Sequence, residues 1–317
     1  MNLDFAQVLS NLAGLFLLIA VGYGAVQLGV IPREISGGLS KLLMKVAVPC
    51  TVFTSLLRPY DPSLIKTVLI ILVLGLTLFP LNALVARPLT RLFRVPEGRR
   101  GVWTFCATFS NSGFMGFPIA LALFGEEGLF MAVVLNITFN ILVYSMGVRM
   151  ICEDRSAGEG GAKVQWRTVL FTSINFSTAL GLIFYFAQLS VPAALLTPLT
   201  HLSNITTPLS MLVTGINLSN GKWSELLRSK DAITAAVTRL VICPAVTFLM
   251  LQGVSALFPH LNPLMICVIF IIFSMPTPAV ATILAENYEA DQEFAALVVF
   301  LSSLFCIVTI PVMSMLI

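Results

Sequence analysis

The sequence predicts an all-α integral membrane protein with ten transmembrane helices, arranged as two inverted repeats of five helices. Of its 317 residues, 57% are hydrophobic and 10% are charged, whereas soluble domains carry about 25% charged residues. The mean hydropathy is +0.96. Apolar segments of about twenty residues recur along the chain, which is typical of a helical bundle rather than a barrel. Interruptions at corresponding places in the two halves indicate the repeat.

The apolar segments define the ten predicted spans, each long enough to cross the hydrocarbon layer. No basic region precedes the first span, and Asp4 lies where a signal peptide would be positive. We therefore expect the first span to be a retained helix. The spans are expected at residues 5–29, 37–57, 64–87, 102–124, 128–151, 167–188, 194–217, 231–257, 263–286 and 293–316.

The distribution of basic residues predicts the orientation in a cell inner membrane. With ten spans, both termini lie on one side, and the loops after the odd-numbered spans lie on the other. Of the 18 Lys and Arg residues, 15 flank the loops after spans one, three, five and seven, so we expect both termini to be extracytoplasmic. Residues 152–166 are rich in Gly and predict a cytoplasmic linker between a first repeat, 1–151, and a second, 167–317.

The two halves align without a gap when the second is shifted by 164 positions. Residues 109–110 then match 273–274, and Glu127 aligns with Asp291. Each half has an odd number of spans, so the two copies cross the membrane in opposite senses. This pattern is typical of secondary transporters.

Spans four and nine are each interrupted by helix-breaking residues. In span four the break lies within Phe109–Pro118, with a first half-helix ending near Ser110. In span nine it lies at Pro276–Pro278, and the helix is expected to resume near Ala279. Irregular backbone at membrane depth is tolerated only inside protein or beside a cavity. We expect the two breaks to cross and form a binding site, although two ordinary helix kinks are the alternative.

The second half-helices are expected to direct their positive N-terminal ends and free N–H groups toward one point, which favours a carboxylate. Asn136 and Asn140 lie on one helix face and either line this site or bridge neighbouring helices. For Ser112, a hydrogen bond to the backbone is an alternative to a ligand role. The candidate substrate-binding residues are Asn111, Ser112, Gly113, Gly116, Pro118, Asn136, Asn140, Arg239, Ser274, Pro276, Thr277 and Pro278.

Arg239 is the one basic residue deep within a span, and a charge inside the membrane indicates function. It either pairs with an anionic substrate or neutralises the negative C-terminal ends of the first half-helices, near Ser110 and Met275. A structural carboxylate partner is a third interpretation.

The sequence also excludes several classes of protein. No span interior contains Asp or Glu, which argues against a dedicated sodium or proton site, and the acidic residues at 286–293 are expected in a solvated loop. Two histidines and six scattered cysteines give no metal-ligand spacing, so we expect no metal or cofactor. No hydrolase motif or nucleophile–base set is present, so an enzyme is not expected. The basic runs are explained by topology and do not indicate nucleic-acid binding.

Five motifs together give the chain a resemblance to a known family. They are Val46–Phe53, Asn111–Pro118 followed by Leu123–Gly125, Pro208–Leu218, Arg239–Pro244 and Pro276–Ala279. In order and spacing the whole chain resembles the auxin efflux carrier family, in its bacterial branch of malonate or malate transporter-like proteins.

The resemblance implies a ten-helix carrier with crossed helices four and nine, an architecture similar to that of bile acid symporters and NhaA-type antiporters. Spans one, two, six and seven would form a scaffold, and spans three to five and eight to ten a moving transport domain. It also implies that Asn111, Pro118 and Pro276–Pro278 belong to the substrate site. Auxin is not expected as the substrate, because Pro-Thr-Pro stands where plant carriers have an asparagine-containing motif. The sodium ligands of the bile acid symporters are also absent.

These observations predict a secondary carrier that moves small carboxylate anions by an elevator-type alternating-access mechanism. Coupling to protons, or downhill anion movement, is expected rather than coupling to sodium. An apolar face on span one or two could support a homodimer, but membrane lipid can cover the same surface. The alternatives are a cation/proton exchanger of the same architecture and a non-transporting, anion-binding membrane sensor.

Overall fold

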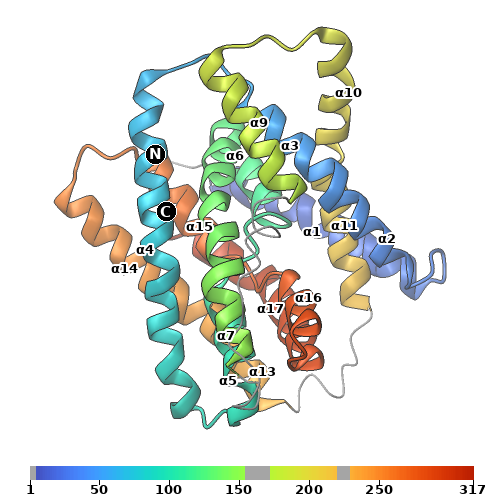
Figure 1. The fold of residues 1–317 in the computed structure, drawn as a ribbon. Helices are drawn as coiled ribbons and strands as arrows, with labels where there is room; N and C mark the ends of the chain where they lie inside the picture. Colours follow the sequence, from blue (N-terminus) through green and yellow to red (C-terminus); the bar gives the residue numbers. More distant parts are fainter. Residues whose placement is uncertain (1–4, 154–171, 220–228) are drawn as a thin grey trace.

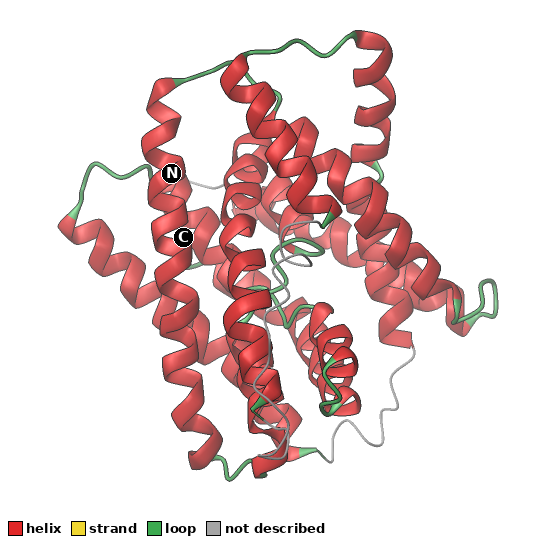
Figure 2. Cartoon of the chain, viewed as in Figure 1, coloured by secondary structure: helices red, strands yellow, loops and turns green. Residues whose placement is uncertain are grey.

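The computed structural model describes residues 5–153, 172–219 and 229–317, and within these ranges the chain forms helices and no strands (Figures 1 and 2). Six helical segments in this part are long and apolar enough to cross a membrane. Two shorter apolar helices are Ser173–Ala187 and Pro263–Phe273. The prediction of an all-helical integral membrane protein is therefore confirmed. The six segments are Ser10–Gln27, Ile35–Leu56, Leu64–Leu92, Gly116–Cys152, Lys230–Leu257 and Gln292–Ser314.

The first half of the chain forms helices over the ranges that its apolar segments predict. The helices are α1 (Phe5–Gln27), α2 (Ile35–Leu42), α3 (Val48–Leu56), α4 (Pro62–Leu92), α5 (Arg100–Thr108), α6 (Gly116–Leu142) and α7 (Val148–Cys152). π-helical segments at Leu43–Ala47 and Val143–Gly147 join α2 to α3 and α6 to α7. The predicted linker 152–166 lies almost entirely outside the described residues.

The described part of the second half forms eight further α-helices. They are α9 (Ser173–Ala187), α10 (Ala193–Asn204), α11 (Thr206–Ser219), α13 (Lys230–Val237), α14 (Cys243–Leu257), α15 (Pro263–Phe273), α16 (Val280–Asn287) and α17 (Gln292–Ser314). A third π-helical segment, Thr238–Ile242, joins α13 to α14 and contains Arg239.

Helix α6 consists of two helices joined at a sharp turn. Gly125 at the turn has φ 66° and ψ −160°, a conformation that is readily adopted only by glycine. The turn lies where the predicted spans four and five should meet. The chain therefore reverses here without leaving a long loop.

One interruption was not expected from the sequence. Predicted span seven divides into α10 and α11, because Pro208 in the first turn of α11 has no N–H to donate to the carbonyl of Asn204. Thr51 on α3 donates its hydroxyl to the neighbouring carbonyl of Ser203 at 3.3 Å. A side chain from another helix thus satisfies part of the interrupted backbone.

The ends of α4, α5, α7 and α13 meet at one end of the molecule (Figure 1), and there the described chain carries Arg87, Arg91, Arg94, Arg99, Arg100, Arg149 and Lys230. Arg99 at the start of α5 pairs with Asp231 at 3.4 Å and with Asp291 at 2.8 Å. Asp291 also caps α17 by accepting from the N–H of Phe294. Asp291 thus ties the acidic segment to α5 while remaining partly exposed, and Glu286 and Glu293 are exposed.

Helices α1 and α11 pack so closely that one glycine in each, Gly22 and Gly215, has no room for a side chain. A Cβ on Gly22 would lie 2.2 Å from the carbonyl oxygen of Leu212, and one on Gly215 would lie 2.0 Å from that of Ile19. Small residues allow this close approach of helix backbones in a membrane. These two glycines therefore hold the first and seventh predicted spans together.

We predict that Gly22→Ala lowers the free energy of unfolding by about 1–3 kcal/mol, because the added methyl forces the two backbones apart. Thermal unfolding of the detergent-solubilised protein measures the effect. Gly14→Ala in the same helix is the control, since no atom lies within 4 Å of its added Cβ. Equal unfolding temperatures for the two variants would contradict the prediction.

Candidate functional site

The interruptions of the fourth and ninth predicted spans contact each other in the interior. The first lies between α5 and α6, and the second between α15 and α16. The N–H of Asn111 donates to the carbonyl of Pro276 at 2.7 Å. The hydroxyl of Thr277 donates to the carbonyl of Cys106 at 2.8 Å. Each break therefore satisfies backbone groups of the other, and we call this contact region the crossover.

The backbone of the first break folds back on itself. The N–H groups of Gly116 and Phe117 donate to the carbonyls of Asn111 (3.0 Å) and Gly113 (3.4 Å), and Pro118 has no N–H. The expectation of free N–H groups at the start of α6 is therefore wrong for these positions. The turn of the break places carbonyls within reach of the donors, which sequence spacing did not reveal. An anion here would be attracted by side chains and by the helix dipole.

The two glycines of the first break differ in their surroundings. A Cβ on Gly116 would lie 2.8 Å from Cδ1 of Ile272 on α15 and 3.2 Å from the carbonyl oxygen of Asn111. For Gly113 the nearest atom is Oδ1 of Asn136, at 3.9 Å. Gly116 therefore permits the close crossing of α6 and α15, whereas Gly113 has open space beside it.

Two asparagine side chains at the first break have amide N–H groups that make no hydrogen bond within the described chain. The side chain of Asn111 accepts from the N–H of Phe114 at 3.2 Å, and that of Asn136 accepts from the Ser112 hydroxyl at 2.7 Å. Both residues are buried, with 8% and 4% of their surface exposed. Within the described chain, neither amide nitrogen donates a hydrogen bond. These two amide groups are available as donors beside the break, together with the buried hydroxyls of Thr108 and Ser110, which have no hydrogen-bond partner within the described chain.

Asn140 does not join this pair. Its amide nitrogen donates to Oδ1 of Asn175 on α9 at 3.0 Å. Of the two interpretations that its position on the helix allowed, the structure shows the bridge between neighbouring helices. Asn136 and Asn140 therefore lie on one face of α6 but contact different parts of the molecule.

The polar groups of the second break are occupied by backbone and by α17. The Ser274 hydroxyl donates to the carbonyl of Phe270 at 2.8 Å. The N–H of Thr277 donates to the Ser302 hydroxyl at 3.1 Å. Pro276 and Pro278 are buried, and α16 begins two residues after Pro278. This half of the crossover is therefore closed by internal hydrogen bonds.

Arg239 lies between the C-terminal ends of the two first half-helices. Its guanidinium donates to the carbonyls of Ala107 (3.3 Å) and Thr108 (2.5 Å) at the end of α5, and to that of Phe273 at the end of α15. The side chain is fully buried, and within the described chain it pairs with no carboxylate. Each helix end carries about half a negative charge, so one arginine neutralises both. This is the second of the roles that the sequence left open.

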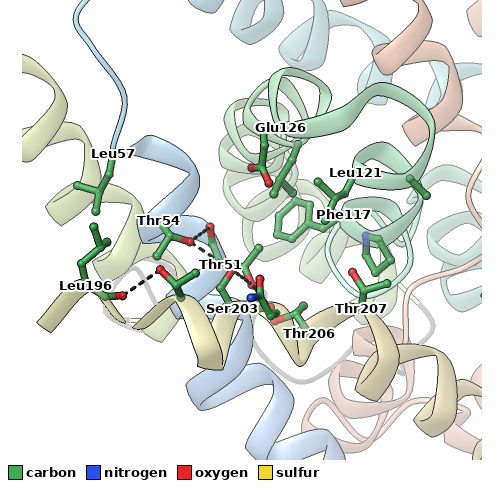
Figure 3. A pocket seen from close by; sticks show the side chains of 15 residues that line it. Thr51, Thr54, Leu57, Phe117, Leu121, Glu126, Leu196, Ser203, Thr206 and Thr207 are labelled. Carbon is green, nitrogen blue, oxygen red and sulfur yellow. Dashed lines mark hydrogen bonds between the residues drawn. The ribbon is translucent and has the colours of Figure 1, made fainter. Parts of the chain in front are cut away.

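A cavity of about 540 Å³ lies beside the crossover, between α3, the α10–α11 junction and the part of α6 on either side of its turn at Gly125 (Figure 3). Pro118 alone of the twelve predicted site residues lines it. The other lining residues are Thr51, Thr54, Leu57, Phe117, Leu121, Ala122, Glu126, Leu129, Leu196, Thr200, Ser203, Asn204, Thr206 and Thr207. Sequence reasoning missed these residues. The side-chain hydroxyls that recur in the sequence near Pro49 and Pro208 could have indicated this cavity.

The cavity wall is held together by hydroxyl groups. The hydroxyls of Thr51 and Thr206 are 2.7 Å apart, and the Thr54 hydroxyl donates to that of Ser203 at 3.2 Å (Figure 3). This network joins α3 to the α10–α11 junction. It presents a polar and largely uncharged surface to whatever enters the cavity.

We predict that Arg239→Ala lowers the free energy of unfolding by about 3–5 kcal/mol, because three buried carbonyls lose a charged donor. Arg239→Lys should give an intermediate loss, since one ammonium cannot span both helix ends as the planar guanidinium does. Thermal unfolding in detergent checks this, with the exposed Arg33→Ala as the control. A variant Arg239→Ala as stable as wild type would contradict this role.

Comparison with known proteins gives matches along nearly the whole chain. Residues 7–314 match the family described as membrane transport protein. An uncharacterized transporter of Methanothermobacter thermautotrophicus is 30% identical over 301 residues, which cover 94% of each chain. A protein of Rhizobium meliloti named "Putative malonate transporter" is 22% identical over 308 residues, covering 96% of this chain and 94% of its own.

The family match and the apolar helices support the same conclusion about the class of protein. The match spans the crossover, the cavity and both halves of the chain. The relatives cover the same range and are named as transporters. The chain therefore belongs to the membrane transport protein family, the auxin efflux carriers that its motifs resemble, and is a multi-pass transporter rather than an enzyme.

Proposed function

We propose that this transporter carries small organic carboxylate anions across a cell inner membrane by an elevator-type mechanism. The observation that carries the proposal is the crossover. Arg239 neutralises the negative helix ends on one side of it, and the amide nitrogens of Asn111 and Asn136 remain as donors beside the first break. A site with spare donors and the positive end of α6 favours an anion.

The substrate class is supported by chemistry and by one relative. Amide N–H groups bind a carboxylate more strongly than a neutral group, because hydrogen bonds to charged acceptors are worth about 1.5–3 kcal/mol. The relative from Rhizobium meliloti is named for malonate. We take a short carboxylic acid as the substrate, without choosing among mono- and dicarboxylates.

The architecture we propose has ten membrane spans in two inverted repeats, residues 1–151 and 167–317. Helices α1, α2–α3, α9 and α10–α11 form a scaffold, and α4–α7 with α13–α17 form a transport domain. The cavity then lies on the boundary between these two parts, because α3, α10 and α11 supply one wall and α6 the other. A substrate held at such a boundary would change sides when the transport domain slides.

The contacts that cross this boundary can break and form again as the two parts move. Asn11 of α1 donates to the carbonyl of Ala122 on α6 at 2.7 Å. The Arg58 guanidinium lies over the Phe130 ring, 4.4 Å from its centre. Within the transport domain, by contrast, Arg239 joins two helices through buried, charge-assisted bonds. The difference supports a rigid transport domain that moves along a weaker boundary.

The membrane potential sets the energetics of this function. With both termini outside, the cavity opens on the extracytoplasmic side, since its lining includes Leu57 directly after α3, Leu196 in the first turn of α10 and Glu126 beside the turn of α6. Moving an anion out of a negative-inside cell gains about 2.3 kcal/mol per charge per 100 mV. Export therefore requires no coupling ion, whereas import requires one.

A cation/proton exchanger of the same architecture is the second candidate. Such a protein needs a buried carboxylate, and Arg239 is the one charged residue among the buried residues of the described chain. This composition favours the anion carrier. An anion-binding sensor that does not transport would bind the same ligands without flux.

We predict that Asn111→Ala lowers carboxylate flux about 10- to 100-fold, because it removes one hydrogen bond to a charged group. Labelled malonate, malate, lactate and indole-3-acetate are tested for uptake into proteoliposomes. The exposed Asn217→Ala is the matched control and should transport as wild type does.

Unchanged flux in Asn111→Ala would show that Asn111 does not bind the substrate. Absence of flux for all four acids, together with a proton or sodium signal, would replace the anion carrier by the exchanger. Binding without any flux would indicate the sensor.

A further inference from the structure

We propose that the cavity beside the crossover selects carboxylates with a single negative charge, and that Glu126 and Thr207 determine this selectivity. Glu126 disfavours a second carboxylate, and Thr207 hydrogen-bonds an uncharged polar group of the substrate, such as a hydroxyl. The inference rests on the proposed function and narrows it from carboxylates in general to polar monocarboxylates. Neither residue belongs to the crossover or to the five sequence motifs.

The cavity is where the part of the substrate beyond the crossover would lie. Phe117 and Pro118, in the first turn of α6, line the cavity, whereas Asn111 and Asn136 lie outside its lining. With one carboxylate held by these two amides, the rest of the substrate extends past the start of α6 into the cavity. A dicarboxylate would have to place its second carboxylate there.

The described lining of this cavity holds no positive charge. Its one ionisable side chain is Glu126, and its other polar side chains carry hydroxyls and one amide. Glu126 is exposed and forms no ion pair in the described chain, so it contributes a negative charge at neutral pH. A carboxylate that leaves water needs a cation or several hydrogen-bond donors in compensation. A second carboxylate would instead meet repulsion.

Neither basic residue that adjoins the lining in sequence belongs to it. Arg58 directly follows Leu57, and its guanidinium lies 4.4 Å from the centre of the Phe130 ring. His201 directly follows Thr200 on α10 and also lies outside the lining. The cavity therefore lacks a fixed cation that would hold a second carboxylate.

Thr207 provides a free hydroxyl on the wall opposite α6. The hydroxyl network described above occupies four of the lining side chains, and the Thr200 hydroxyl donates to the carbonyl of Leu196 at 2.9 Å. Within the described chain the Thr207 hydroxyl makes no hydrogen bond, and the residue is half-buried in the first turn of α11. Figure 3 shows it on the α11 wall, below Phe117 and Leu121 of α6. A hydroxyl of the substrate can bond Thr207 without displacing an existing partner.

The expected size of each effect follows from simple electrostatics and hydrogen bonding. Two like charges about 10 Å apart, in a cavity that opens to water, change relative affinity about two- to fivefold. Reversing the charge at position 126 applies this factor twice, which gives about 4- to 25-fold. Salt screens exposed charges, so both effects should shrink as the ionic strength rises. Loss of one hydrogen bond changes affinity about two- to tenfold.

The first test compares labelled malonate with malonamate, in which an uncharged amide of similar shape replaces one carboxylate. Uptake into proteoliposomes is measured at pH 7.5 with the membrane potential held at zero, so that the potential does not act on the extra charge. Wild type should prefer malonamate. The malonate-to-malonamate ratio of kcat/KM should rise about two- to fivefold in Glu126→Gln and about 4- to 25-fold in Glu126→Lys, and less in about 0.5 M salt.

A matched control separates the local charge from the net charge of the protein. Glu34→Lys makes the same change of charge at an exposed position outside the lining and should leave the ratio as in wild type. If Glu126→Lys fails to reconstitute, the smaller rise in Glu126→Gln decides the question.

The second test compares lactate with propionate, which differ by one hydroxyl. Thr207→Val should lower the lactate-to-propionate ratio of kcat/KM about two- to tenfold. Thr200→Val is the control within the same cavity, because its hydroxyl already donates to the carbonyl of Leu196, and it should leave the ratio unchanged.

Transport of malonate by wild type as fast as that of malonamate, or faster, would overturn the proposal. Loss of such a preference for malonate in Arg58→Ala would then identify Arg58 as the partner of the second carboxylate. An unchanged ratio in the Glu126 variants, or in Thr207→Val, would overturn the role of that residue while leaving the carrier intact. Absence of flux for every acid in wild type would overturn the carrier itself and the selectivity with it.

Discussion

The contact between Arg239 and the ends of α5 and α15 is the interaction on which the rest of the structure depends. Breaking two helices inside a membrane leaves carbonyl groups that water cannot reach. A buried guanidinium is equally unfavourable without partners. In this molecule the carbonyls and the guanidinium satisfy one another, because Arg239 donates to the carbonyls of Ala107, Thr108 and Phe273 at the two helix ends. The π-helical segment around Arg239 sets its position on the helix, and such segments are frequent at functional sites.

The two sides of the crossover differ in which hydrogen-bonding groups remain free for a ligand. The C-terminal ends are occupied by Arg239, and the second break is closed by Thr277 and its partners. The unused donors at the first break are the amide groups of Asn111 and Asn136 and the hydroxyl groups of Thr108 and Ser110. Beyond them lies a cavity walled by hydroxyl groups, with Glu126 as its charge.

The sequence predicted the features that depend on local chemistry. The helix ranges follow from hydropathy, and the breaks at 109–115 and 274–279 follow from Gly and Pro, whose backbone effects do not need a tertiary context. Features that depend on contacts between distant segments were less accessible. The N–H groups of Gly116 and Phe117 are bonded within the break, although they were expected to be free. The cavity was missed because its hydroxyls come from α3 and α10–α11, whose proximity no spacing reveals, and because Glu126 looks like an ordinary turn residue. The choice between the two roles of Arg239 also required the fold.

If the crossover moves as one body against α1, α3, α9 and α10–α11, a cross-link between these two parts must stop transport. In a background lacking the six native cysteines, cysteines at Asn11 and Ala122 are bridged by mercury across the proposed boundary, where these residues are in contact. A matched pair at Asn82 and Thr247, which are hydrogen-bonded within the proposed transport domain, is bridged in the same way. We expect the first bridge to stop carboxylate flux, a thiol reductant to restore it, and the second bridge to leave flux intact. Continued transport with positions 11 and 122 bridged would contradict an elevator movement.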